Sequence, residues 1–383
     1  MVNNIDTQRD LAFFHFRPIF LILKYLKRLY KTIKKWYSMG IKKKELTMSI
    51  IDNVKIEEGS LSSCVKVECL SAGDKIILPE NHIIANKRLT FTARLPKLCD
   101  GDVITLGHGE KLYCASYLTL TNKEIKIYEY LLEDKELYSA EHGLEISGII
   151  SIIIEVGYST TRITISSAGG VYLGEWKART WSGRNGSVFA YCNERELTDV
   201  TLRWYSPDLN KDIWLFGDSY FNPVSPMRWP YYLVEAGYTN FLLSGYPGRD
   251  TTSALIDFKE LINHGTPKFA VWCMGMNDMD DGENVNERYK KATDEFLEIC
   301  KERGIIPILS TIPSVPERSN NGKNNFVRNS GYRYIDYARA VGGEEMGSSW
   351  FHGMLYTDLV HPDTLGAKAL YVATITDFPE IMK

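Results

Sequence analysis

The sequence predicts a mixed α/β fold, in which a three-layer α/β/α domain built on a parallel sheet follows an all-β sandwich. Two observations predict it. Between about residues 50 and 208, apolar and polar residues alternate with a period of two, which is typical of half-buried antiparallel strands. After Asp208, short apolar runs alternate with helical stretches, which indicates crossover connections and a parallel sheet covered by helices. We therefore expect a sandwich at 49–208 and an α/β domain at 209–383, after a separate segment at 1–48.

Length and composition agree with a folded protein of about two domains. The chain has 383 residues, of which 44% are hydrophobic, 12% aromatic and 24% charged, as in ordinary globular proteins. The formal net charge is -3, but it is unevenly distributed. Residues 1–48 hold eleven Lys or Arg and three Asp or Glu, a net of +8, which leaves -11 for the rest. Only the N-terminal segment is basic.

This basic segment has the pattern of an amphipathic helix, because apolar residues recur every three or four positions between Lys and Arg residues. Such a helix can lie on an anionic membrane surface. Two alternatives stay open: it packs on its own protein, or it is an upstream extension, since Met48 opens a more ordinary start. The segment matches a signal peptide poorly, and no uncharged stretch approaches the 18 or so residues of a membrane span. We expect a cytoplasmic protein, with peripheral membrane contact through residues 1–48 as one alternative.

The seven cysteines form no CxxC pair and no regular spacing. Their odd number favours reduced thiols over a disulfide framework, and their scatter argues against a zinc site. We expect no metal and no cofactor.

The sandwich is predicted from alternating runs and from one dense apolar run followed by a hairpin. The alternating runs lie near residues 65–69, 89–95, 125–127 and 200–204, and the hairpin spans 149–156 and 162–165. The segment weakly resembles a jelly-roll of the lectin type. Sandwiches of this kind can hold sugars on exposed aromatic side chains, and Tyr158, Tyr172, Trp176 and Trp181 are available, although aromatic residues in strands more often belong to the core.

The elements of the α/β domain follow one another in regular alternation. We expect strands at 213–216, 239–243, 269–274 and 305–310, and helices at 229–236, 251–263, 285–303, 325–340 and 364–375. In such a sheet, ligands bind where the strands end at their carboxyl edges. Four short motifs lie at these edges or before the last helix: Gly217-Asp-Ser219, Gly245-Tyr-Pro-Gly248, Gly275-Met-Asn-Asp278 and Asp358-Leu-Val-His361.

These motifs contain the parts of a nucleophilic site. A serine hydroxyl attacks well only when an imidazole removes its proton, and the imidazole must be oriented by a carboxylate or a carbonyl. Ser219, His361 and Asp358 supply these groups, and the three-residue spacing of Asp358 and His361 lets the carboxylate reach the ring. The backbone amides of Ser219 and Gly248 and the side-chain amide of Asn277 could form an oxyanion hole.

The order of these motifs resembles the SGNH, or GDSL-type, hydrolase family over roughly residues 210–383. The resemblance implies that Ser219 is the nucleophile, that His361 and Asp358 complete the triad, and that Gly248 and Asn277 stabilise the oxyanion. It also implies the three-layer fold. Two positions depart from the family: Tyr220 stands where Leu often follows the serine, and Leu243 and Ser244 stand where Asn commonly precedes the glycine loop. These departures bear on the subfamily rather than on activity.

We therefore expect a serine esterase that removes acyl groups, first of all O-acetyl groups, from a carbohydrate, with no nucleic-acid partner. The alternatives are a lipid or thioester hydrolase and a non-catalytic glycan-binding protein. Arg249 and Trp350 are candidate substrate contacts because they lie near the motifs. The structural alternative for the motifs is that Asp218 and Ser219 cap a helix or turn, Asn277 and Asp278 form an Asx turn, and His361 is an ordinary surface residue. The oligomeric state is not predicted.

Overall fold

A computed structural model describes most of the chain after residue 60. The described residues are 61–79, 86–110, 114–130, 134–158, 160–176, 187–206, 209–221, 225–278, 284–344 and 350–383. The expectations for residues 1–48 and for the side chains of Trp176 and Trp181 lie outside what the structure describes. None of the helices in the described ranges is both long enough and apolar enough to span a membrane.

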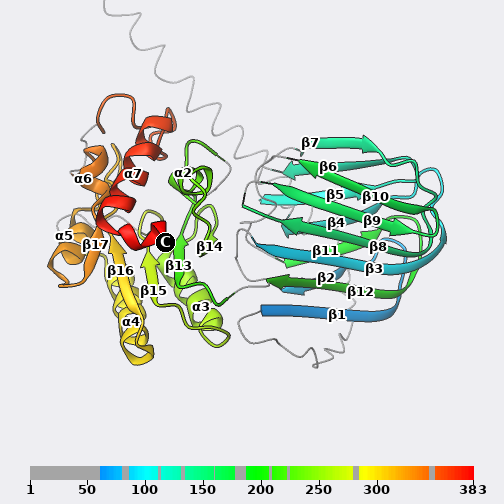
Figure 1. Ribbon diagram of the computed structural model, residues 1–383, viewed down its shortest axis with the longest axis horizontal. Helices are drawn as coiled ribbons and strands as arrows, with labels where there is room; N and C mark the ends of the chain where they lie inside the picture. The colour runs from blue at the N-terminus through cyan, green and yellow to red at the C-terminus, as the bar shows by residue number, and fades with distance from the viewer. Residues whose placement is uncertain are drawn as a thin grey trace, which may run out of the picture. The chain divides into compact units, whose positions relative to one another are not determined.

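Residues 61–206 form two six-stranded antiparallel sheets (Figure 1). In the first sheet the strand order is β1 (Leu61–Leu70), β12 (Leu197–Ser206), β3 (Lys87–Lys97), β8 (Ser147–Val156), β9 (Thr161–Ser167) and β10 (Gly170–Trp176). In the second sheet the order is β2 (Ile76–Pro79), β11 (Ser187–Cys192), β4 (Ile104–Glu110), β5 (Cys114–Leu120), β6 (Glu124–Tyr130) and β7 (Asp134–Glu141).

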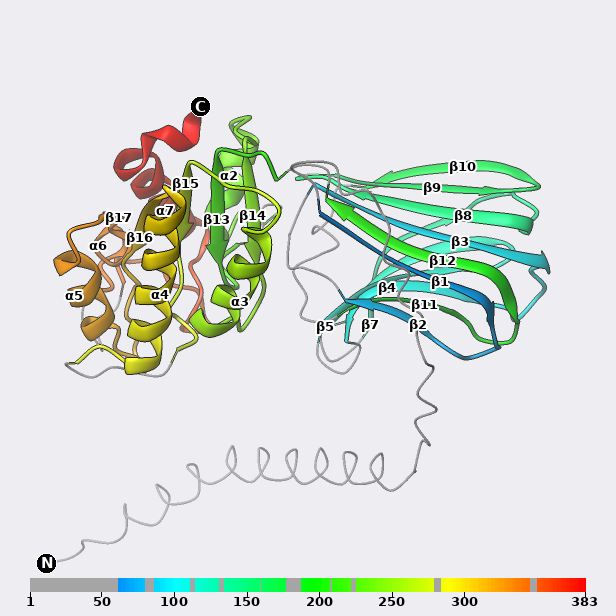
Figure 2. The same ribbon diagram turned by 90° about the horizontal axis from the view of Figure 1, so that it is seen from below.

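The two sheets lie face to face, and Figure 2 shows them one above the other. The sheets pack together because each has one apolar face. In strand β8, for example, buried residues alternate with more exposed ones, so the buried side chains point toward the other sheet. Leu89, Phe91, Leu106 and Ile152, from both sheets, are fully buried in a shared core. The expected antiparallel strands are thus present, whereas the jelly-roll-like assignment stays a prediction.

Residues 213–335 form a separate parallel sheet in the order β14 (Phe241–Gly245), β13 (Ile213–Gly217), β15 (Phe269–Trp272), β16 (Ile306–Ser310) and β17 (Arg333–Ile335). Helices connect its strands and follow them. These are α2 (Trp229–Glu235), α3 (Thr251–Leu261), α4 (Glu287–Arg303), α5 (Asn321–Asn329), α6 (Tyr337–Val341) and α7 (Thr364–Asp377), with the 3-10 turn η1 (Pro379–Met382).

Helices cover both faces of the parallel sheet (Figure 1). Successive strand residues point to opposite faces, so Trp214 and Phe216 pack in the cluster that contains α3 and α4. Ile213 and Leu215 pack in the cluster that contains α2, α6 and α7. The expected three layers are therefore present in this domain.

One predicted helix is wrong. The sequence pattern favoured a single helix at 325–340, but the structure has α5, then the short strand β17, then α6. The break lies at Gly331, whose φ of 77° is in the left-handed region that suits glycine. The Asn329-Ser-Gly331 sequence is a turn signal, and β17 extends the sheet by pairing with β16.

Two glycines end the strands nearest the expected nucleophile. Gly217 of β13 pairs with Gly245 of β14, and the side chain of Phe221 lies against this pair. A Cβ at Gly217 would lie 2.1 Å from the Phe221 ring, and a Cβ at Gly245 would lie 2.8 Å from the carbonyl oxygen of Gly217. The glycines thus let the turn after β13 fold back closely over the strand ends.

We predict that Gly217→Ala destabilises the protein by about 1–3 kcal/mol, because the methyl group overlaps the Phe221 ring. Denaturant unfolding of Gly217→Ala, Phe221→Ala and the double variant measures this. The double variant should lose less free energy of unfolding than the two single losses added together, since it removes the overlap. Strict additivity would contradict the proposed contact.

Candidate active site

The imidazole of His361 joins the two other side chains expected at the site. Its Nε2 lies 2.8 Å from Ser219 Oγ, and its Nδ1 lies 2.8 Å from Asp358 Oδ2. Ser219 follows β13, whereas Asp358 and His361 precede α7, so 142 positions of sequence separate the hydroxyl from the ring. Both distances are within the range for proton exchange through a hydrogen bond.

A tight turn fixes the carboxylate against the ring. Asp358 Oδ1 accepts hydrogen bonds from the amides of Val360 (3.0 Å) and His361 (2.9 Å), which leaves Oδ2 for the ring nitrogen. Leu359, directly after Asp358, has a φ of 60°. This left-handed conformation costs a non-glycine residue about 1–2 kcal/mol. The backbone bends sharply here, and the bend aims the carboxylate and the ring at each other.

The turn after β13 presents the serine. Asp218 Oδ1 accepts a hydrogen bond from the Tyr220 amide at 3.1 Å, and the Phe221 amide bonds the Asp218 carbonyl at 3.2 Å. The Asp218 carboxylate is buried, and burial raises its pKa to about 6 despite the opposing bond from the Tyr220 amide. Asp218 therefore shapes the turn, while Asp358 is the carboxylate that contacts the imidazole.

Two further residues that contact the site, Tyr220 and Arg228, were not singled out from the sequence as site residues. The Tyr220 hydroxyl donates to the carbonyl of Val360 at 2.6 Å, and its ring centroid lies 5.7 Å from that of His361. Arg228 Nε donates to the Ser219 carbonyl at 2.6 Å. Tyr220 thus ties the serine turn to the histidine turn. Only its place directly after the serine could have drawn attention to it, and Arg228 carries no sequence signal.

The surroundings of His361 favour its neutral form. Burial lowers the pKa of the imidazole first, the positive charge of Arg228 lowers it further, and the hydrogen bond to Asp358 opposes both. The pKa of Asp358 is itself lowered: its partial burial acts in the opposite direction, but the amides of His361 and Val360 and the ring together outweigh it. Near neutral pH the site therefore holds a neutral imidazole beside a carboxylate, as a general base requires.

The expected oxyanion donors lie on two neighbouring loops. Gly248 is exposed and has a φ of 80°, with nothing within 4 Å of the place where a Cβ would stand. Asn277 Nδ2 donates to the carbonyl of Arg249, the residue after Gly248, at 3.0 Å. The side-chain amide of Asn277 has a second N–H, which is left for another acceptor. Within the described residues, the backbone amides of Ser219 and Gly248 bond no protein acceptor. These N–H groups are available to a substrate oxygen.

The prediction that Arg249 touches the substrate is wrong. Its side chain is fully buried, with Nη2 2.5 Å from Asp257 Oδ2 and Nη1 3.1 Å from Ser244 Oγ. Its guanidinium also lies over the rings of Phe216 and Tyr246. Burial raises the pKa of Asp257 to about 6, which still leaves it ionised at neutral pH. Arg249 therefore anchors the loop that carries Gly248 to the helix and strands beneath it.

The prediction for Trp350 is also wrong. Only 3% of this residue is exposed, and its Nε1 donates to the carbonyl of Ser314 at 2.8 Å. The ring belongs to the core cluster beside α6 and α7. Its apolar ring surface is packed in the core and its one donor, Nε1–H, is hydrogen-bonded there, so it does not face a substrate.

Residues that could bind a metal do not gather elsewhere in the described ranges, where no group of three or more His, Cys, Asp or Glu side chains is placed to hold an ion. Free thiols are found at Cys64, Cys69, Cys99, Cys192, Cys273 and Cys300.

Comparisons with known proteins give structural similarities only. No family model matches the chain, and no curated protein matches it. The chain is similar to a GDSL-like lipase from Bacteroides thetaiotaomicron, with 19% identity and a TM-score of 0.36, over 44% of this chain and 88% of that one. It is also similar to a carbohydrate esterase of family 3 from Talaromyces cellulolyticus, with 14% identity and a TM-score of 0.36, over 44% and 97%. A psychrotrophic esterase from Pseudoalteromonas matches at 12% identity and a TM-score of 0.35, over 45% and 98%.

We predict that Tyr220→Phe lowers kcat for an ester substrate by about three- to tenfold and leaves KM nearly unchanged. The variant keeps the ring but loses one hydrogen bond to Val360, worth about 0.5–1.5 kcal/mol, so the imidazole is held less firmly. Steady-state kinetics measure the effect, and Tyr232→Phe, which removes a hydroxyl from α2, is the matched control. Equal kinetics for Tyr220→Phe and the parent would show that this bond does not position the ring.

We also predict that activity is lost on the acid side with an apparent pKa below 6.5, the ordinary value for histidine. A protonated imidazole cannot accept the serine proton, and both burial and Arg228 favour the neutral ring. Arg228→Gln should move this loss of activity to higher pH, whereas Arg228→Lys keeps a positive charge and should move it less. Profiles of kcat/KM against pH test this, and an unchanged or lowered apparent pKa in Arg228→Gln would contradict it.

Proposed function

We propose that this protein is a serine esterase that hydrolyses its substrate through an acyl-enzyme. The observation that supports this most is the imidazole of His361, which contacts a serine hydroxyl on one side and a carboxylate on the other, each at 2.8 Å. A serine that only caps a turn needs neither contact. The three groups come from distant parts of the chain, and their meeting supports a nucleophile activated by a general base.

In the proposed first step, Ser219 Oγ attacks the ester carbonyl carbon while His361 Nε2 takes the hydroxyl proton. Asp358 stabilises the imidazolium that forms. The negative charge on the carbonyl oxygen is stabilised by the amides of Ser219 and Gly248 and by the free N–H of Asn277. When the tetrahedral intermediate collapses, the C–O bond to the alcohol breaks, and the alcohol takes the proton from His361.

In the second step, water attacks the acyl-enzyme. His361 accepts a proton from the water as its oxygen bonds the acyl carbon, and the same donors stabilise the second oxyanion. Ser219 then leaves with the proton returned by His361, and the carboxylic acid is released. Ser219 and His361 are the residues that exchange protons in these steps, and at the end the serine hydroxyl and the neutral imidazole are restored.

We propose an O-acetylated carbohydrate as the substrate. The open position of the site supports a bulky alcohol part, since Gly248 and Asp358 are both exposed and an acyl group displayed on a polymer could reach Ser219. An all-β region followed by an α/β domain resembles the arrangement of carbohydrate esterases, which supports a carbohydrate.

A specific feature favours a second candidate, a lipid or thioester hydrolase. The segment that carries Asp358 and His361 also exposes the apolar side chains of Phe351, Tyr356 and Leu359. Such side chains near a catalytic histidine could contact a long acyl chain. The basic segment at 1–48 would suit a membrane-bound substrate, although it lies outside the described residues.

We predict that the protein hydrolyses p-nitrophenyl acetate and that Ser219→Ala abolishes the turnover. Asn277→Ala should lower kcat by about 10²–10³, the usual loss for one oxyanion donor. Asn263→Ala is the matched control, because this exposed amide bonds only a helix carbonyl. Turnover that persists in Ser219→Ala would overturn the proposed mechanism, and no turnover of any ester by the parent would favour a binding protein.

The length of the acyl chain separates the two substrate candidates. An acetylesterase should prefer the acetyl ester over the decanoyl ester in kcat/KM, because its site has no need to bury a long chain. A preference for decanoyl would favour the lipid or thioester hydrolase. Acetate release from acetylated glycans then identifies the sugar.

A further inference from the structure

The outer face of the first antiparallel sheet carries a row of polar residues that runs across five strands. Strand pairing places Tyr205 (β12) opposite Arg88 (β3), Arg88 opposite Glu155 (β8), Glu155 opposite Arg162 (β9), and Arg162 opposite Glu175 (β10). Adjacent strands lie about 4.8 Å apart, so the row is about 19 Å long. We call these five residues the polar row.

The charges of the polar row alternate in sign and are paired. Arg88 Nη2 lies 2.5 Å from Glu155 Oε1, and Arg162 Nε lies 2.5 Å from Glu175 Oε2. All four charged side chains stay at least 42% exposed, so their remaining donor and acceptor positions face solvent. Cross-strand pairs of this kind stabilise a sheet by only about 0.2–1 kcal/mol each, so stability alone gives little reason for the whole row.

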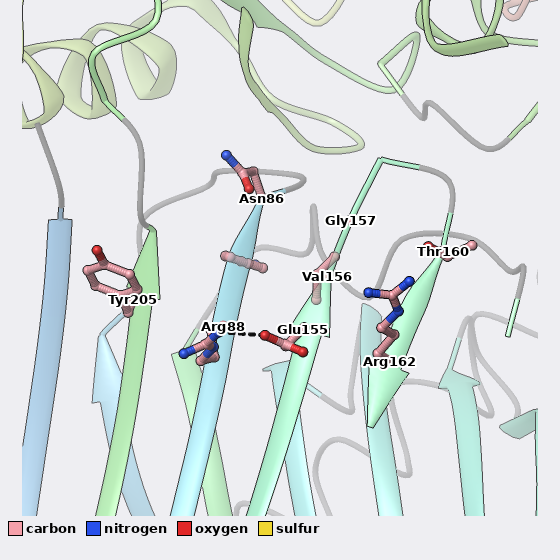
Figure 3. A pocket seen from close by; sticks show the side chains of 9 residues that line it. Asn86, Arg88, Glu155, Val156, Gly157, Thr160, Arg162 and Tyr205 are labelled. Atoms are coloured by element: carbon pink, nitrogen blue, oxygen red, sulfur yellow. Dashed lines mark hydrogen bonds and ion pairs between the residues drawn. The ribbon is translucent and has the colours of Figure 1, made fainter. Parts of the chain in front are cut away.

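A hollow of about 340 Å³ lies along four of these residues (Figure 3). Its lining includes Arg88, Glu155, Arg162 and Tyr205, the buried Lys87, and Asn86 and Thr160, which directly precede β3 and β9. Figure 3 shows Tyr205 on one side of the Arg88–Glu155 pair and Arg162 on the other. The volume is within the range of small-molecule sites, which is about 300–1,000 Å³.

The alternation of charge along the polar row limits what the row can bind. Guanidinium groups only donate hydrogen bonds and carboxylates only accept them. An anion laid along the row would meet the carboxylates of Glu155 and Glu175, and a cation would meet the guanidinium groups of Arg88 and Arg162. An apolar ligand would bury both ion pairs without replacing their water. A neutral ligand rich in hydroxyl groups can donate to the glutamates and accept from the arginines at the same time.

Tyr205 adds a feature that suits a sugar ring. Its phenol ring stands at one end of the row, and the guanidinium carbon of Arg203, two residues earlier, lies 5.7 Å from the ring centroid. An aromatic face beside paired donors and acceptors can contact the C–H face of a sugar while its hydroxyl groups bond the charged row. We propose that the polar row and the hollow bind a neutral oligosaccharide laid across the strands.

This proposal rests on the proposed function, because it assigns the carbohydrate to a second site away from Ser219. It is tested in the full chain carrying Ser219→Ala, so that binding is measured without turnover. Titration calorimetry with neutral hexasaccharides of glucose, xylose, mannose and N-acetylglucosamine, and with the acidic hexagalacturonate, gives the affinities. Ester turnover of the parent protein is measured separately. A protein that hydrolyses esters but binds no sugar would therefore contradict only this proposal, and one that binds sugar without hydrolysing esters would contradict only the proposed function.

We expect at least one neutral hexasaccharide to bind more tightly than the uronate. Glu155→Gln and Tyr205→Ala should each weaken that binding by about tenfold or more, which corresponds to 1.4 kcal/mol. The matched control is Arg94→Gln. Arg94 lies on the same strand and the same face as Arg88 but outside the hollow, and the change breaks its exposed ion pair with Asp199 of β12. This variant should bind like the parent.

The proposal is overturned if none of the neutral sugars binds at millimolar concentration, or if the uronate is the preferred ligand. It is also overturned if Glu155→Gln and Tyr205→Ala both bind like the parent, or if Arg94→Gln loses as much affinity as they do. Thermal unfolding of each variant distinguishes a lost contact from a lost fold.

Discussion

Two hydrogen bonds to the ring of His361 hold the candidate active site together. The imidazole lies between Ser219 Oγ and Asp358 Oδ2 at 2.8 Å on each side, so its position decides whether the serine can lose a proton. Burial and the charge of Arg228 keep the ring neutral, and the carboxylate keeps it oriented. If the ring moved away, the hydroxyl would be an ordinary serine at a strand end, and the exposed amides near it would have no reaction to assist.

Packing inside the domain holds the segments of Ser219, His361 and Gly248 in position. The paired glycines at the ends of β13 and β14 allow the serine turn to pack closely, and Tyr220 connects that turn to the segment of His361. The buried Arg249–Asp257 pair fixes the loop of Gly248 on α3, and the Asn277 side chain bonds the carbonyl of Arg249. Leaving either buried charge without its partner would be costly, so the pair holds the loop in one place. The donors are therefore positioned before a substrate arrives, which is what electrostatic catalysis requires.

The alternation of strands and helices could be predicted because strand and helix periods are local properties of the sequence. The side chains that meet at the site were predicted from the chemistry of four motifs and from the resemblance of their order to the SGNH family. Prediction from the sequence failed at 325–340, where a short turn at Gly331 and the pairing of β17 with β16 outweighed the helical pattern. It also failed for Arg249 and Trp350, since closeness to a motif does not tell which way a side chain points. Asp257 and Ser314 hold these two side chains inside the domain, and contacts of that kind depend on the fold.

The central claim, that His361 activates Ser219, is tested most directly by covalent labelling with a fluorophosphonate. Such a reagent bonds a serine oxygen only when a neighbouring base activates it, and intact-mass and peptide mass spectrometry locate the adduct. The account predicts one adduct per chain, on the peptide that contains Ser219, and its loss in His361→Ala. An unlabelled parent protein, or labelling of Ser219 that proceeds equally well without the imidazole, would contradict it.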